Sequence, residues 1–284
     1  MRSDPKYLNS DALGRIASLV TVRDIFTPFI ASFDTNRPVE DVWQEWMELS
    51  IESECSPMNQ FALAVSDGKP VGILAFEDLD AGKVLSTCAR EIRLDMLVTE
   101  DTPLAQAARM FAEHEAYFFV VIRGNEFVGW LSYHDLYKLP FRLCLFAALL
   151  SIEERMLSVI QKEAARCLSR LSKGRQDAAR KLYHLRGFKL DELGHEEPRQ
   201  LVTCTTFIDK ATMIQQSHWI KAVPAASERK WMNLAERVRN KLAHPSPDEG
   251  SFPLVDRKKF GGFLTWLERL GEQLAAILAN TANE

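Results

Sequence analysis

Residues 71–79 read VGILAFEDL, and residues 128–136 read VGWLSYHDL. The valine, glycine, aspartate and leucine of the two stretches recur at a constant separation of 57 residues. At the same separation, the apolar run 61–65 corresponds to the apolar run 118–122. Short apolar runs bounded by turn-forming residues predict buried strands. The sequence therefore predicts an internal repeat, in which each unit is a strand, a tight turn, a second strand and a helix that begins near the aspartate.

A helix with one apolar face is predicted upstream of each pair of strands. The first helix begins near Pro38 and the second near Pro103, and proline suits the first turn of a helix. The two prolines are 65 residues apart, so the first unit has about eight extra residues before its strands. The stretch 52–60 is the natural place for this insertion.

These residues resemble the CBS family. Residues 22–28 (VRDIFTP) look like the opening of a CBS repeat, and residues 101–104 (DTPL) and the two endings with glycine, aspartate and leucine also match. The resemblance implies an α/β tandem CBS module over residues 1–139, with repeats at about 20–80 and 90–138. Such a pair packs with clefts between its units and most often binds an adenine nucleotide as a regulatory ligand.

The resemblance also suggests which residues contact that ligand. In the family, a Ser or Thr of the ending motif meets phosphate, and the Asp three residues later meets the ribose hydroxyls. The second unit has Ser132 and Asp135, whereas the first has Asp78 but Ala75 in place of the hydroxyl. A carboxylate can accept both diol hydrogen bonds, and a hydroxyl at a helix start suits an anion. We therefore expect one good cleft at Ser132 and Asp135 and a weaker one at Asp78.

A purely structural interpretation of the same residues stays open. Ser132 and Asp135 have the spacing of a helix capping box, and Asp78 has the place of a negative charge at a helix start.

The second half of the chain has helical spacing throughout. We expect an all-α domain over residues 140–284. Its predicted helices cover residues 141–171, 175–187, 198–222, 226–243 and 254–279.

One stretch of this half, residues 237–245 (RVRNKLAHP), resembles the Arg-x(4 to 6)-His signature of HEPN domains. These domains are helical bundles, and many are metal-independent ribonucleases with an Arg and a His from each chain at a dimer interface. The family pattern selects Arg239, with Asn240 after it and His244 as the histidine. On a continuous helix Asn240 and Arg237 share the face of His244, so Arg237 stays an alternative to Arg239.

The HEPN resemblance implies a specific chemistry. His244 would be general acid or base, Arg239 would stabilise charge on the scissile phosphate, and Asn240 would orient the site. The RNA 2′-hydroxyl would attack and leave a 2′,3′-cyclic phosphate, without a metal. The alternative is an ordinary helix C-terminus, where basic residues are favoured.

Charge, cysteine spacing and apolar content restrict the binding partners and the cellular location that we expect. Residues 1–139 carry 12 basic and 22 acidic residues, and residues 140–284 carry 23 basic and 17 acidic residues, so only the second half is basic. The five cysteines are spread without Cys-x-x-Cys spacing, which favours neither disulfides nor a zinc site. No apolar run is long enough for a membrane span, and we expect a cytoplasmic protein.

The preferred hypothesis from the sequence is a nucleotide-regulated, metal-independent RNA endonuclease that acts as a homodimer. By analogy, this architecture suits a toxin or phage-defence protein. The alternative is a non-enzymatic regulatory or interaction protein, in which a ligand-sensing CBS module controls a dimerising helical domain.

Overall fold

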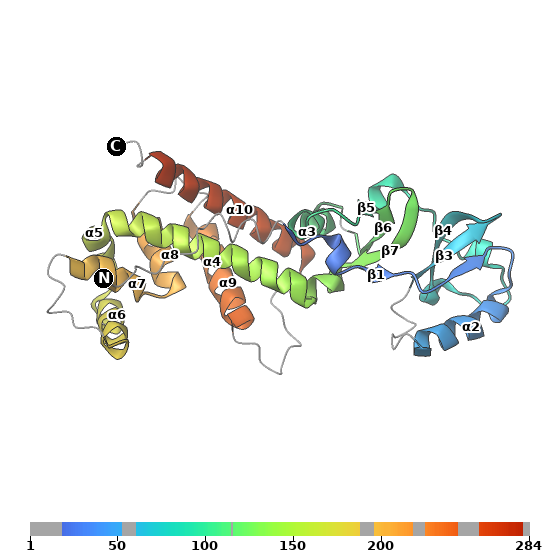
Figure 1. The fold of residues 1–284 in the computed structure, drawn as a ribbon, viewed down its shortest axis with the longest axis horizontal. Coiled ribbons are helices and arrows are strands. Elements are labelled where there is room, and N and C mark those ends of the chain that lie inside the picture. Colours follow the sequence, from blue (N-terminus) through green and yellow to red (C-terminus); the bar gives the residue numbers. More distant parts are fainter. Residues whose placement is uncertain are drawn as a thin grey trace, which may run out of the picture. The chain divides into compact units, whose positions relative to one another are not determined.

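A computed structural model describes residues 19–52, 61–114, 116–187, 196–217, 225–243 and 256–280. The described chain divides into two compact units, one over Val20–Phe141 and one that begins at Arg142 (Figure 1). The first unit is α/β and the second is helical, in agreement with the fold class expected from the sequence.

Two sheets form the α/β unit. A three-stranded sheet has the order β2-β3-β4, and a four-stranded sheet has the order β1-β7-β6-β5. The strands are β1 (Thr27–Pro28), β2 (Ser32–Asp34), β3 (Phe61–Ser66), β4 (Lys69–Ala75), β5 (Leu97–Thr99), β6 (Phe118–Arg123) and β7 (Glu126–Ser132). The helices are η1 (Val22–Asp24), α2 (Val39–Glu52), η3 (Phe76–Asp78), η4 (Leu85–Thr87), η5 (Leu94–Met96), α3 (Leu104–Glu113) and η6 (Tyr133–Tyr137).

The repeat predicted from the sequence is present in the backbone. In each half a short strand runs parallel to a longer one, which pairs antiparallel with the strand that follows it. Both antiparallel ladders shift register at one point, after Ala64 in the first and after Val121 in the second. These positions are 57 residues apart, which is the separation of the sequence repeat.

The recurring glycine of the repeat has a steric cause. A Cβ on Gly72 would lie 2.7 Å from the carbonyl oxygen of Arg90, and a Cβ on Gly129 would overlap the carbonyl oxygen of Thr27 and lie 2.6 Å from the ring of Phe26. At both places another segment of backbone crosses the strand, so only glycine allows the approach.

Apolar side chains fill each repeat and the space between the two. The core of the first repeat includes Phe33, Val42, Trp46, Leu74, Phe76 and Leu85. A second cluster joins side chains of both repeats, and it contains Ile73, Phe118 and Val120 with Phe29, Phe61 and Phe127 against them. The two repeats therefore share one apolar interface.

The helical unit contains seven described α-helices. They are α4 (Leu139–Lys162), which begins before the unit, α5 (Ala164–Leu168), α6 (Lys173–Leu185), α7 (Glu197–Thr203), α8 (Phe207–Gln216), α9 (Ala225–Ala243) and α10 (Arg257–Asn280). Buried side chains of α4 and α10 fill much of its core, and Arg155 of α4 donates a 2.9 Å hydrogen bond to the carbonyl oxygen of Gly271 in α10, which runs beside it (Figure 1).

Two expected helices are each divided in the structure. The helix predicted over 141–171 ends at Lys162, because Glu163 adopts φ −128° and ψ 44°, and α5 follows. The helix predicted over 198–222 is interrupted after Thr203, and α8 begins with a capping box in which Thr206 and Asp209 bond to each other's backbone N–H. In the described part of the chain, every helix is too short or too polar to span a membrane.

Candidate functional site

The motif of the second repeat lies where β7 ends and η6 begins. Asp135 Oδ2 accepts hydrogen bonds from the backbone N–H of Ser132 at 2.6 Å and from its hydroxyl at 2.8 Å, and the N–H of Asp135 donates to Ser132 Oγ at 3.3 Å. This is a complete capping box, so the structural interpretation of the motif is realised. The box fixes Asp135 in one position, and its side chain is buried.

The other oxygen of Asp135 faces the segment before β2. Lys138 Nζ lies 2.7 Å from Oδ1 and also donates to the carbonyl oxygen of Ile25 at 2.6 Å. The hydroxyl of Thr27, in β1, donates to the same Oδ1 over 3.4 Å. A carboxylate has about four acceptor positions, so the long bond from Thr27 is the weakest of its four contacts.

The motif of the first repeat is bonded differently. Arg90 Nε lies 2.5 Å from Asp78 Oδ2, and Arg90 Nη2 lies 2.8 Å from Asp78 Oδ1. The same Nη2 also donates to Glu77 at 3.1 Å. These hydrogen bonds, chiefly those that Arg90 donates to Asp78, raise the pKa of the Arg90 guanidinium. Asp78 is thus held in a bidentate ion pair, which is the strong form of this interaction.

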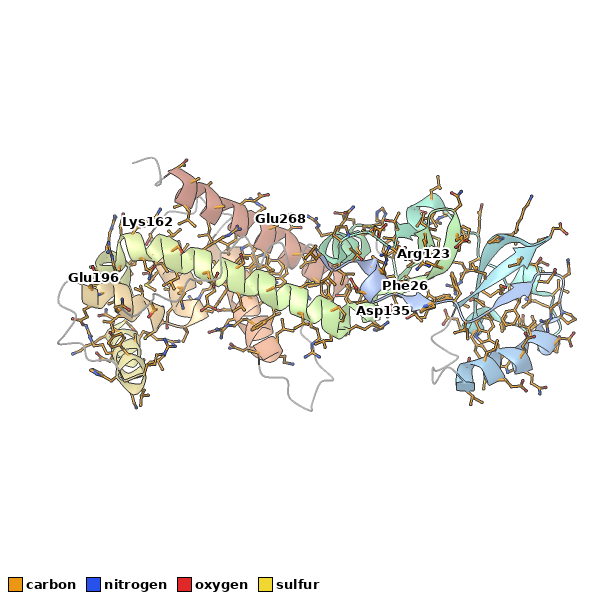
Figure 2. The ribbon with its side chains drawn as sticks, viewed as in Figure 1. Phe26, Arg123, Asp135, Lys162, Glu196 and Glu268 are labelled. Carbon is orange, nitrogen blue, oxygen red and sulfur yellow. The ribbon has the colours of Figure 1, made fainter. Side chains whose placement is uncertain are left out.

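A cavity of about 980 Å³ lies between the two repeats. Both motifs contribute to its wall, which contains Ser132, His134 and Asp135 from the second repeat and Ala75 and Glu77 from the first. Figure 2 labels Asp135 in this unit. The rest of the wall is mainly aromatic and charged, and consists of Phe61, Arg90, Arg93, Asp95, Met96, His114, Ala116, Tyr117, Phe118 and Trp130.

Aromatic rings form one side of this cavity. The centroids of Phe61 and Phe118 are 4.2 Å apart, and Trp130 meets Phe61 edge-on at 4.9 Å. Tyr117 lies at the rim with 76% of its surface exposed. Flat aromatic faces beside a buried carboxylate suit a ligand that has both a planar ring and hydroxyl groups.

Two arginines line the cavity, and each is paired with a carboxylate. Arg93 forms a bidentate pair with Asp95, at 3.1 and 3.0 Å, and this lowers the pKa of the Asp95 carboxyl. Arg90 and Arg93 are each partly exposed toward solvent. Guanidinium groups in such a wall are suited to phosphate oxygens.

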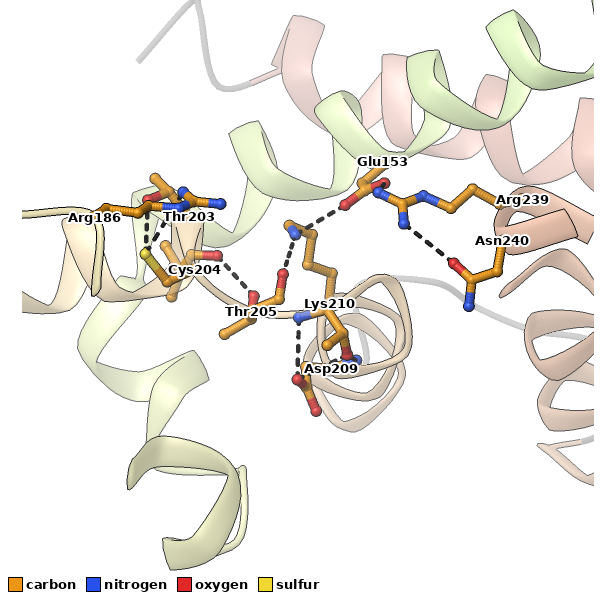
Figure 3. Close-up of polar contacts among 11 residues, drawn as sticks. Glu153, Arg186, Thr203, Cys204, Thr205, Asp209, Lys210, Arg239 and Asn240 are labelled. Atoms are coloured by element: carbon orange, nitrogen blue, oxygen red, sulfur yellow. Dashed lines mark hydrogen bonds and ion pairs between the residues drawn. The ribbon is translucent and has the colours of Figure 1, made fainter. Parts of the chain in front are cut away.

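In the helical unit, α9 carries three of the four residues singled out by the HEPN resemblance. Arg239 Nη2 lies 3.2 Å from Glu153 Oε2 on α4, and its Nη1 donates to Asn240 Oδ1 at 3.2 Å (Figure 3). Arg237 and Asn240 are exposed. The structure therefore brings Arg239 and Asn240 together, whereas His244 lies outside the described residues.

A buried lysine, which the sequence analysis did not identify, completes this cluster. Lys210 Nζ donates to Glu153 Oε1 at 3.0 Å and to the carbonyl oxygen of Thr205 at 2.6 Å (Figure 3). Lys210 is only 3% exposed. A lysine in the stretch 207–214, whose other residues are mostly apolar, was the available signal, because a buried lysine needs an acidic partner. Glu153, within the apolar face of α4, is that partner.

No metal centre is indicated in the described part of the chain. Its histidines, cysteines and acidic residues form no group of three that could hold a metal ion.

Comparison with known proteins gives one family match. The family model for the CBS domain matches residues 90–141. A search of the curated proteins finds no match to the sequence.

Three solved structures illustrate the similarity. A CBS domain protein from Pyrobaculum aerophilum complexed with AMP is 19% identical, covers 44% of this chain and 96% of its own, and has a TM-score of 0.33. The CBS domains of a transcriptional regulator from Streptococcus pneumoniae are 16% identical, at 42% and 97% coverage and a TM-score of 0.31. The CBS domain of a membrane protein from Sphaerobacter thermophilus is 15% identical, at 45% and 93% coverage and a TM-score of 0.35. By the family match, residues 90–141 of this chain are a CBS domain.

Proposed function

We propose that the unit Val20–Phe141 is a sensor that binds an adenine nucleotide in the cavity between its two repeats. The observation that carries this proposal is the composition of the cavity wall. Ser132 and Asp135 meet aromatic rings and two arginines in a space of about 980 Å³, which is within the size range of a cofactor pocket. The CBS domain at residues 90–141 supports the same function.

In this proposal a ribose hydroxyl replaces the Thr27 hydroxyl on Asp135 Oδ1. The bond that it replaces is 3.4 Å long, so little is lost when it breaks. The base packs against the aromatic side of the cavity, near Trp130 and Tyr117. The phosphates lie toward Ser132 and the two arginines, whose guanidinium N–H groups can donate to phosphate oxygens.

A thermal-shift assay with AMP, ADP and ATP tests this function. A nucleotide present at 100 times its dissociation constant should stabilise the fold by about 2.7 kcal/mol, and Asp135→Ala should abolish the shift. Because this substitution also removes a helix cap, the matched control is Asp209→Ala, which destroys the similar Thr206–Asp209 box far from the cavity in the sequence. The control should lower the melting temperature but keep the nucleotide shift. An unchanged shift in Asp135→Ala would disprove this site.

The second candidate function is RNA cleavage by the helical unit, with Arg239, Asn240 and His244 as its site and Arg237 as the alternative arginine. The favouring observation is the charge of the buried cluster. Lys210 already neutralises Glu153, so Arg239 keeps a net positive charge. Its Nε makes no hydrogen bond within the described residues. A phosphate group is the kind of ligand that this guanidinium suits.

Labelled RNA incubated with the full chain, with and without EDTA, tests this second function. Cleavage should continue in EDTA, yield 2′,3′-cyclic phosphate ends and disappear in His244→Ala. His184→Ala is the matched control, because His184 is an exposed histidine of α6 outside the motif. Cleavage that is equal in the His244 and His184 variants would exclude the mechanism.

Together these proposals describe a homodimer in which nucleotide binding regulates an RNA endonuclease, in keeping with a toxin or phage-defence role. The ligand would act through its different affinity for two arrangements of the chain. If RNA stays intact with every nucleotide, the alternative is a non-enzymatic regulator whose helical unit dimerises or binds a partner. Sedimentation with and without nucleotide would then show whether the ligand changes the assembly state.

A further inference from the structure

The two repeats differ in the residue that faces the motif aspartate. In the second repeat, Trp130 of β7 pairs with Thr27. In the first repeat, Ile73 of β4 stands 57 residues before Trp130 and forms an isolated bridge with Arg90. Thr27 and Arg90 therefore occupy equivalent positions in the two halves of the module, each on the segment that crosses a glycine of the repeat.

The two residues act differently on equivalent carboxylates. Thr27 donates one 3.4 Å hydrogen bond to Asp135, whose cationic partner is Lys138 at 2.7 Å on the single oxygen Oδ1. Arg90 instead makes two short, charge-assisted bonds to Asp78, at 2.5 and 2.8 Å, one to each oxygen. Charge-assisted bonds are roughly twice as strong as neutral ones. The asymmetry extends to the cavity, because Asp135 belongs to its described wall, whereas at the first motif Arg90 and Glu77 belong to it and Asp78 does not.

We propose that Arg90 closes the motif of the first repeat, so that the module binds one nucleotide, and that Asp78 is a latent second site. This inference rests on the proposed nucleotide function. The guanidinium occupies both oxygens of the carboxylate that would otherwise meet the ribose hydroxyls. Ala75 contributes to the closure, because it stands where the second repeat has Ser132 and offers no hydroxyl to a phosphate.

Isothermal titration of the full chain with AMP and with ATP tests the proposal by stoichiometry. The wild type should bind one nucleotide per chain. The double variant Ala75→Ser with Arg90→Thr gives the first motif the equivalents of Ser132 and Thr27 and should bind two. The control is Arg93→Thr, which removes an arginine from the same cavity but leaves the Arg90–Asp78 pair intact. It should bind more weakly, still at one nucleotide per chain.

The reverse exchange tests the same idea without opening a new site. Thr27→Arg places a guanidinium beside Asp135 and should reduce binding at least tenfold, whereas Thr27→Gln, of similar length but uncharged, should reduce it less. The comparison of Thr27→Arg with Thr27→Gln keeps the proposal testable if the double variant does not fold.

The outcomes separate this inference from the nucleotide function. If the wild type and the double variant each bind one nucleotide, or if the wild type binds two, the closure by Arg90 is wrong. The proposed nucleotide function would still stand. Binding by the double variant only would support the closure and overturn the proposed site at Asp135. If neither protein binds a nucleotide, both proposals fail.

Discussion

Arg123 holds the buried carboxylate of Glu100 through two hydrogen bonds, 2.8 and 2.7 Å long. On the other side, Arg23 of η1 donates to Glu100 Oε1 at 2.8 Å, and the backbone N–H of Arg23 donates to the Glu100 carbonyl oxygen at 2.9 Å. The start of the first repeat is thereby fixed to the second repeat. This matters for the proposed site, because the same segment carries Thr27 to Asp135.

The arginines around Glu100 predict a pH dependence. Hydrogen bonds from Arg123 and then Arg23 lower the pKa of Glu100 from 4.5 to about 2. Because the folded-state pKa is depressed, this carboxylate stabilises the fold fully above the ordinary value, and the contribution is lost as the pH falls toward 2. Glu100→Gln should therefore be less stable than the wild type near pH 6 and should lose less stability on acidification. Urea unfolding at several pH values measures both effects.

The control for this prediction is Asp101→Asn. Asp101 also accepts a bond from Arg23, but its side chain is 76% exposed and its ion pair is solvated. This variant should follow the pH profile of the wild type. If Glu100→Gln and Asp101→Asn gave the same profile, the role of the buried carboxylate would be wrong.

The crossing backbone at Gly129 predicts a strong effect of a single methyl group. Gly129→Ala would place a Cβ against the Thr27 carbonyl and 2.6 Å from the Phe26 ring, and overpacking of this kind costs about 1–3 kcal/mol. Gly72→Ala should behave similarly, because its Cβ would lie 2.7 Å from a backbone oxygen. Gly174→Ala, in the helix α6 with open space around it, should be neutral or stabilising by up to about 1 kcal/mol. Equal effects of all three in denaturant unfolding would contradict this explanation.

The buried pair of Lys210 and Glu153 predicts non-additive stability effects. Lys210→Met leaves a buried carboxylate with Arg239 alone and should cost about 3–5 kcal/mol. The double variant Lys210→Met with Glu153→Gln removes both charges and should recover part of this loss. Arg239→Ala should cost less than Lys210→Met, because Arg239 is 31% exposed and leaves the inner pair intact. Additive effects of the two substitutions in a double-mutant cycle would show that the pair is not coupled.

The repeat could be predicted from the sequence because it depends on local signals. Short apolar runs, turn residues and a recurring glycine appear in both copies at one separation. The capping geometry of Ser132 and Asp135 was also readable, since it joins residues only three apart. Each of these signals can be read within one short stretch of chain, although the backbone that crosses Gly129, at Thr27, is distant in the sequence.

The interactions that the sequence did not reveal join distant residues. Arg90 meets Asp78 across 12 residues, and Lys210 meets Glu153 across 57. Nothing in a single sequence shows which of many charged residues will pair, because the choice depends on how the strands and helices pack. The break in the helix predicted over 198–222 did have a local signal, because Thr206 and Asp209 have the spacing of a capping box. The helical spacing of the apolar residues around it favoured one continuous helix instead.

The most direct test of the nucleotide proposal is a crystal structure of the full chain grown with ATP. We expect density for one nucleotide in the cavity between the repeats, with a ribose hydroxyl within hydrogen-bond distance of Asp135 Oδ1 and Arg90 still bonded to Asp78. A cavity that stays free of nucleotide at saturating ATP, or a nucleotide bound elsewhere on the chain, would contradict it.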